Sequence, residues 1–368
     1  SEPVTGLENA DISLSGTAGA TTAVVTGSGT TYNVAVSGMT SSGTVIATVP
    51  AGNAVDAAGN GNSNSISGDN TVVYDFTPTP VTINQSAIQA DPTNAAPIMF
   101  EVIFAKPVTG FTDTDVTLAG TAGATTATVT GSGTTYNVAV SGMTNSGSVI
   151  ASIPAGVATD TLGNANAAST STDNIVIYDI TNPTVIINQA VSQPDPTGAS
   201  PINFTVVFSE PVTGFASADL NLSGSTGATT ATVTGSGTTY NVAVSGMTNS
   251  GTLFVTITDG AGSDAAGNPS EPSTSIDNSV KFDIGAPSVT INQATGQADP
   301  TNTLPIIFTV VFSKPVAGFT SADVVLTGSA VATSVTATGS GANYTVEVSG
   351  ITEPGTVIVT IPANRAKD

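Results

Sequence analysis

Acidic side chains recur at fixed positions in a chain that carries few other charges. There are 26 Asp and Glu residues against five Lys and Arg residues, and the chain contains no His, Cys or Trp. Carboxylates with nearby carbonyl groups supply the oxygen ligands that Ca²⁺ prefers. Four sets of aspartates each repeat every 104 residues: Asp11, Asp115, Asp219 and Asp323; Asp56, Asp160, Asp264 and Asp368; Asp69, Asp173 and Asp277; and Asp75, Asp179 and Asp283.

This spacing suggests a calcium site at each joint between repeats. The first three sets are expected at the end of a repeat where the chain enters it. The fourth set is expected at the end of the preceding repeat where the chain leaves it. All four sets would therefore meet at the joint between two successive repeats. Calcium is the one candidate cofactor. The candidate ligands are Asp75, Asp115, Asp160, Asp173, Asp179, Asp219, Asp264 and Asp277.

A purely structural interpretation of these aspartates stays open. Three members of the Asp56 set begin a D-x-x-G-N motif. In such turns the Asp side chain accepts hydrogen bonds from backbone N–H groups two residues on. The chain also has no EF-hand spacing. The aspartates of the D-P-T motifs, Asp91, Asp195 and Asp299, are expected in type I turns.

Composition argues against catalysis and against two kinds of partner. Without His or Cys the chain lacks the usual general base near neutral pH and a thiol nucleophile. A net charge of −21 disfavours binding to nucleic acid and to anionic membrane faces. Direct membrane insertion is not expected either, because no apolar run approaches the roughly 18 residues of a membrane span. The sequence therefore predicts a protein that is not an enzyme.

A hairpin organises the chain. The segment GATTATVTGSGTTYNVAVSGMTNSG occupies residues 123–147 and recurs unchanged at residues 227–251. β-branched and aromatic residues alternate with small polar ones on both sides of Gly-Ser-Gly, a pattern that predicts strand, turn and strand. Four tyrosines occupy the same position in successive repeats: Tyr32, Tyr136, Tyr240 and Tyr344. Their rings are expected to pack in the core; the alternative is that they form a surface on which sugars stack.

The period defines tandem units. About seven short strands per unit, separated by turn residues, predict all-β, immunoglobulin-like antiparallel β-sandwich domains in an elongated array. At about 35–45 Å per sandwich, four in line would span roughly 150 Å. The expected repeats are residues 1–77, lacking the first two strands, 78–181, 182–285, and 286–368, lacking the last strand. The missing strands either lie outside this window or are donated by neighbouring subunits.

Residues 183–224, with the later Ser-Asp-Ala-Ala-Gly-Asn at 263–268, resemble the bacterial Ig-like repeats of large surface adhesins and filament proteins. The resemblance covers the whole chain. It implies an extracellular β-sandwich, tandem deployment and, in some relatives, calcium between domains.

The expected function is structural. The chain would form part of an extracellular bacterial filament or cell-surface stalk, with copies of itself as partners along or beside the filament. The alternative is an adhesin whose Ig-like domains bind a surface glycan or a receptor. Lys106 and Lys314 occupy the position of the repeat that holds Glu2 and Glu210 in the other two copies. This alternation of charge suggests either solvated residues at the edge of each domain or lateral pairing between neighbouring chains.

Overall fold

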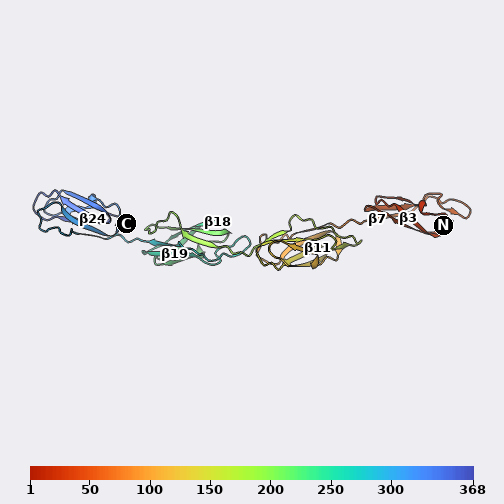
Figure 1. Ribbon diagram of the computed structural model, residues 1–368, viewed down its shortest axis with the longest axis horizontal. Helices are drawn as coiled ribbons and strands as arrows, with labels where there is room; N and C mark the ends of the chain where they lie inside the picture. Colours follow the sequence, from red (N-terminus) through yellow and green to blue (C-terminus); the bar gives the residue numbers. More distant parts are fainter. The chain divides into compact units, whose positions relative to one another are not determined.

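The computed structural model describes residues 1–368, and almost all of its regular structure is β-strand (Figure 1). The helical segments are single 3-10 turns: η1 (Asn9–Asp11), η2 (Asp113–Asp115), η3 (Ser217–Asp219) and η4 (Ser321–Asp323). No helix is long and apolar enough to span a bilayer. The all-β prediction is confirmed.

The chain forms two compact units. The first comprises Ser1–Thr184, Phe208–Phe215 and Asp259–Glu271, and the second comprises Val185–Val207, Ala216–Thr258 and Pro272–Asp368. Strands pair with strands of their own predicted repeat. The 104-residue period therefore also describes the hydrogen-bonding pattern, while the domain boundaries themselves stay a prediction.

The first repeat has seven short strands in three small sheets. The sheets have the orders β2-β5-β7, β3-β4 and β1-β6. The strands are β1 (Val4–Thr5), β2 (Ser13–Ser15), β3 (Thr22–Ser28), β4 (Thr31–Ser37), β5 (Gly43–Thr48), β6 (Val55–Asp56) and β7 (Thr71–Tyr74).

The second repeat is a two-sheet sandwich. One sheet has the order β11-β9-β13 with β8 also paired to β9, and the other has the order β10-β12-β14. A single buried cluster contains residues of both sheets, which makes the repeat a sandwich. The strands are β8 (Val81–Gln85), β9 (Ile98–Thr109), β10 (Thr117–Ala119), β11 (Thr126–Ser141), β12 (Gly147–Ser152), β13 (Thr159–Asp160) and β14 (Ile175–Tyr178).

The last two repeats follow the same plan. Their sheets have the orders β15-β16-β18, β17-β19-β20, β21-β22-β24 and β23-β25. The strands are β15 (Val185–Gln189), β16 (Ile202–Val212), β17 (Leu220–Gly224), β18 (Thr230–Ser245), β19 (Gly251–Ile257), β20 (Ser279–Phe282), β21 (Val289–Gln293), β22 (Ile306–Val316), β23 (Val325–Thr327), β24 (Ser334–Ser349) and β25 (Ile358–Thr360).

Buried and exposed side chains alternate along β9, and the buried ones form part of the core of the second repeat. Ile98, Phe100, Val102 and Phe104 are at most 1% exposed, whereas the intervening Ile103 is 47% exposed. Successive side chains of a strand point to opposite faces, so one face of β9 enters the core and the other faces solvent.

The predicted hairpin is present in the first repeat as the antiparallel pair β3 and β4, whereas in the second repeat the same segment belongs to a single strand, β11, in which Gly131 begins the Gly-Ser-Gly sequence. Gly131 has a φ of +119°, and a Cβ added there would lie 2.5 Å from the carbonyl oxygen of Thr135. In the first repeat the same turn joins β3 to β4, with Ser28 opposite Thr31. Only glycine fits this backbone conformation and this close approach.

The tyrosines of the hairpin belong to the core in three repeats. Tyr136, Tyr240 and Tyr344 are 5–8% exposed, and Tyr32 is half-buried. The Tyr136 hydroxyl donates to the Val108 carbonyl over 3.1 Å, and its ring packs edge-on against Phe104 and Phe111. The core prediction is therefore confirmed for these three tyrosines, and their rings are not free to stack on a sugar.

Neighbouring residues of β9 test this alternation. We expect Phe104→Ala to lower the free energy of unfolding by about 3–5 kcal/mol, because it leaves a cavity in the core. Ile103→Ala, one residue away on the exposed face, should cost less than about 1 kcal/mol. Urea denaturation followed by circular dichroism measures both changes. Equal losses would contradict the assigned inward face.

Candidate functional site

The first group of charged side chains joins the first two repeats within the first compact unit. Lys106, on β9, places Nζ 2.6 Å from Asp75 Oδ2 and 3.4 Å from Asp160 Oδ2. Asp75 follows β7 directly, and Asp160 is the last residue of β13. The Asp160 side chain is only 3% exposed, so its charge is paired away from bulk water. The ammonium group occupies the position between two carboxylates where the sequence suggested a metal ion.

The D-x-x-G-N turn holds Asp160 in place. Asp160 Oδ1 accepts hydrogen bonds from the backbone N–H groups of Leu162 and Asn164, both over 2.9 Å. The Asn164 amide donates to Asp160 Oδ2 over 3.1 Å and also to the main-chain oxygen of Asp75 over 3.1 Å. The predicted turn chemistry is therefore confirmed, and Asn164 links the turn to the end of the preceding repeat.

Hydrogen bonds and the lysine shift the titration of this group. The hydrogen bond from Lys106, followed by those from Thr77, holds the pKa of Asp75 well below its usual range. Burial acts to raise the pKa of Asp160, but the hydrogen bonds from Asn164, Leu162 and Lys106 outweigh it and lower the pKa. Asp75 in turn raises the pKa of Lys106.

The second compact unit contains the same arrangement 208 residues later. Lys314 Nζ lies 2.8 Å from Asp283 Oδ2 and 2.7 Å from Asp368 Oδ2. It also donates to the main-chain oxygen of Gly285. The hydrogen bond from Lys314 lowers the pKa of Asp283 to about 2.

A third group, within the first compact unit, is made only of acids. Asp179, Glu210 and Asp264 offer carboxylate oxygens that all lie within 4.8 Å of one another. Asn268 donates to Asp264 Oδ2 over 2.9 Å and to the main-chain oxygen of Asp179 over 2.9 Å, as Asn164 does in the first group. Burial, with the charges of Asp264 and Asp179, raises the pKa of Glu210. Ser146 donates to Asp179 Oδ1 over 2.9 Å.

The remaining predicted ligands lie apart from these groups. Asp115 Oδ2 accepts from the Thr112 backbone N–H over 2.7 Å, and Asp219 Oδ2 accepts from the Ala216 backbone N–H over 2.8 Å, so both cap 3-10 turns. Asp173 and Asp277 are exposed, and their main-chain oxygens accept from Gln85 and Gln189 beside β8 and β15. Of the eight candidate aspartates, four therefore gather with a charged partner: Asp75 and Asp160 with Lys106, and Asp179 and Asp264 with Glu210.

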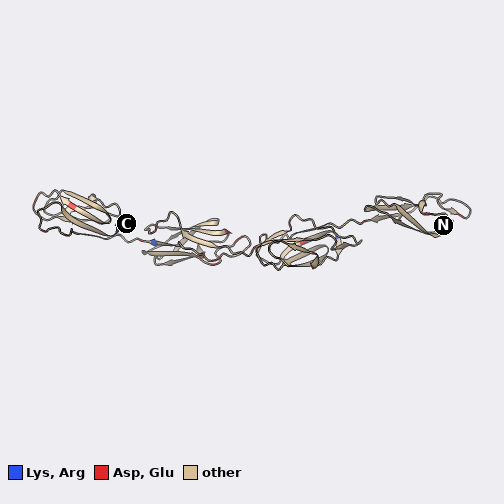
Figure 2. Ribbon diagram, in the orientation of Figure 1, with Lys and Arg blue, Asp and Glu red and all other residues tan.

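The lysines were noticed in the sequence but interpreted differently. Their shared phase with Glu210 suggested solvated rim residues or lateral pairing between chains. In the structure, Lys106 and Lys314 instead form ion pairs within their own chain. The useful signal was the phase itself: Lys106, Glu210 and Lys314 occupy one position in successive repeats. Figure 2 shows how sparse charged residues are along the ribbon.

Calcium binding remains a prediction, now confined to the Asp179–Glu210–Asp264 group. Ca²⁺ at about 100 times its Kd would stabilise the folded state by about 2.7 kcal/mol. We expect Glu210→Lys to abolish this response, because a lysine there reproduces the Lys106 and Lys314 ion pairs. Differential scanning calorimetry with calcium or a chelator measures the effect. Glu271→Lys, an exposed acid of the same repeat, is the control. A wild-type melting curve unaffected by both additions would contradict the prediction.

Acid should weaken the lysine groups. Because the folded-state pKa values of Asp75 and Asp283 are depressed, their contribution to stability is present above the ordinary Asp pKa of about 3.9. It is lost as the pH falls, toward about 2 in the case of Asp283. We expect the double variant Lys106→Met, Lys314→Met to lose less stability than the wild type between pH 5 and pH 2.5. Denaturant titrations at both pH values test this, with exposed Lys281→Met as the control. Parallel losses in all three proteins would contradict it.

Comparison with known proteins addresses the repeat type. Among curated proteins, none matches the chain. Residues 179–284, close to one 104-residue period, match the sequence model of the family described as bacterial Ig-like domain. The antiparallel sheets of β15 to β20 lie within this range. Residues 179–284 are thus a bacterial Ig-like domain in sequence, set in a chain whose sheets repeat the same plan.

Proposed function

We propose that the chain is a non-enzymatic structural region of a bacterial cell-surface stalk or filament, where it provides reach and mechanical continuity. The observation that carries the proposal is a hydrogen bond repeated at two joints. Asn164 donates to the main-chain oxygen of Asp75 over 3.1 Å, and Asn268 donates to that of Asp179 over 2.9 Å. The same hydrogen bond thus recurs at two joints, 104 residues apart. This recurrence supports a joint whose geometry repeats together with the sequence.

A second set of contacts supports the same role. The hydroxyl groups of Ser42, Ser146 and Ser250 donate to the aspartates that close the last strand of each repeat, over 3.1, 2.9 and 3.2 Å. These bonds fix the chain where it leaves a sandwich. Antiparallel sandwiches also resist pulling along the chain, because several backbone hydrogen bonds must shear together. Copies of the same chain are the proposed partners.

The proposed location is the cell surface. Bacterial Ig-like domains often lie there, and residues 179–284 match that family. The alternative of an adhesin that binds glycans through these domains has weaker support, because the tyrosines suited to sugar stacking are 5–8% exposed in three repeats.

Removing the two joint asparagines tests the spacer function. We expect Asn164→Ala with Asn268→Ala to broaden the distribution of particle dimensions in small-angle X-ray scattering and negative-stain images, because each joint loses its link to the preceding strand. Melting should shift by only a few degrees, since each lost hydrogen bond is worth about 1 kcal/mol. The control is Asn145→Ala with Asn249→Ala, whose amides contact only the adjacent threonine. A wild-type chain that scatters as a compact particle would refute the proposal.

A further inference from the structure

A short loop joins β11 to β12, and a loop of the same sequence joins β18 to β19. Both read Met-Thr-Asn-Ser, with the asparagine at position 145 or 249 and exposed to solvent. The first and last repeats carry Ser41 and Glu353 at this position. An asparagine followed by a serine is therefore confined to the two central copies of this loop.

The side chains of these two asparagines are held only by their neighbours. The Asn145 carboxamide donates to Thr144 Oγ1 over 3.0 Å, and the Asn249 carboxamide donates to Thr248 Oγ1 over 3.1 Å. The backbone N–H of the serine that follows each asparagine has no acceptor within the protein. Each loop thus combines a weakly held carboxamide with an adjacent backbone nitrogen that is free to react.

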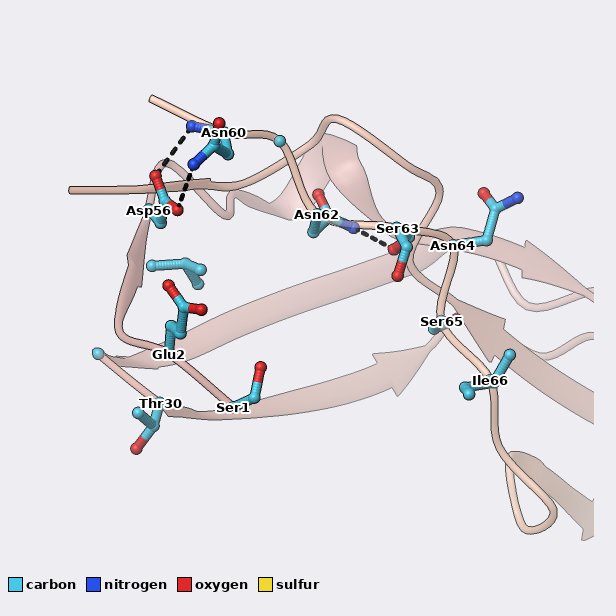
Figure 3. Close-up of a pocket in the computed structure, with 13 residues that line it drawn as sticks. Ser1, Glu2, Thr30, Asp56, Asn60, Asn62, Ser63, Asn64, Ser65 and Ile66 are labelled. Carbon is cyan, nitrogen blue, oxygen red and sulfur yellow. Dashed lines mark hydrogen bonds between the residues drawn. The ribbon is translucent and has the colours of Figure 1, made fainter. Parts of the chain in front are cut away.

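The other asparagines that precede Gly, Ala or Ser are held more firmly. In each of them the carboxamide bonds to a group outside the adjacent residues. Asn60, which precedes Gly61, donates to Asp56 Oδ2 over 2.9 Å (Figure 3). Asn278, which precedes a serine, is half-buried and donates to the main-chain oxygen of Val255 over 2.9 Å. The two loop asparagines are the exceptions.

The chemistry open to such a pair is cyclisation, which makes asparagine a thermolabile residue. The serine nitrogen loses its proton to base and forms a bond to Cγ of the asparagine, while the bond from Cγ to the amide nitrogen breaks. Ammonia leaves with a proton taken from water, and a succinimide ring remains in the main chain. Water then opens this ring at either carbonyl group. The product is aspartate, or isoaspartate with an extra methylene group in the main chain.

The serine of each loop also fixes the point where the chain leaves its repeat, here called the chain exit. Ser146 Oγ accepts from the Ile180 backbone N–H over 3.0 Å and donates to Asp179 Oδ1 over 2.9 Å. In the third repeat Ser250 makes the same two bonds. A longer main chain next to this serine and a new carboxylate near the aspartate both weaken these bonds.

We propose that Asn145 and Asn249 are sites of spontaneous deamidation, where conversion to aspartate and isoaspartate releases the serine hydroxyl from the chain exit. The reactants are the chain itself and water. The chain exits of the second and third repeats therefore loosen with age, whereas that of the first repeat, where Ser41 precedes Ser42, does not. The inference goes beyond the proposed spacer function, and its failure would leave that function intact.

The test incubates the whole folded chain at mildly alkaline pH and follows each site by mass spectrometry of peptides. The peptides extend beyond Gly147 and Gly251, because the sequence before these residues is the same in both copies. Asn278 is the internal control with the same Asn-Ser dipeptide. We expect it to react at least about tenfold more slowly, because local opening must first break its bond to Val255. In urea all three sites should react at similar rates.

Hydrogen exchange measures the effect on the chain exits. After incubation the amides of Ile180 and Ile284, which donate to Ser146 and Ser250, should exchange faster. The Phe76 amide, which donates to the Ser42 hydroxyl over 3.0 Å, should exchange as before.

A double variant, Asn145→Gln with Asn249→Gln, blocks the reaction because glutamine closes its ring far more slowly. Both side chains are in solvent, so the fold should be unchanged and all three amides should stay protected during incubation. The proposal is overturned if the loop asparagines of the folded chain react no faster than Asn278. It is also overturned if the reacted chain exchanges the Ile180 and Ile284 amides at the rates of the glutamine variant.

Discussion

The alternation of side chains along the β9-type strand is the constraint on which the rest of the structure depends. Its inward residues form the aromatic and aliphatic core of the sandwich, where Phe104 packs against Phe111 and Tyr136. Two residues beyond Phe104, the same strand delivers Lys106 to the joint. Core and joint are therefore set by a single register. A slip of one residue would turn the core face to solvent and move the charge away from its partners.

Much of this was accessible from the sequence because the period is long and the residue pattern simple. Period-two alternation and Gly-Ser-Gly turns predict strands and hairpins, and the structure contains them. The D-x-x-G-N turn was also predictable, since the side chain of Asp160 bonds only to residues two and four positions on and to a lysine. Local chemistry of this kind does not depend on the path of distant segments.

The composition of the joint was harder to predict. Asp173 shares the period of Asp160, yet only the path of the polar segment between them decides that Asp173 lies beside β8 while Asp160 lies against Lys106. The sequence also gave no reason to pair Lys106 with Asp75, 31 residues away, in preference to solvent. Three positions in phase carry Lys, Glu and Lys, so the charge of this one residue changes sign from each joint to the next while the surrounding aspartates stay the same. The repeats thus share a fold and differ in whether a lysine is present to pair with the aspartates of the joint.

The identity of the two central hairpins has a consequence for biogenesis. Residues 123–147 and 227–251 are the same, and each hairpin must pair with its own partner strand, β9 or β16. Those partners have similar inward residues, so side-chain packing hardly distinguishes the correct pairing from an exchange between neighbours. Emergence of the chain during synthesis favours the correct pairing, because one sandwich can close before the next hairpin exists. Refolding from denaturant removes that order, and swapped strands are the error it favours.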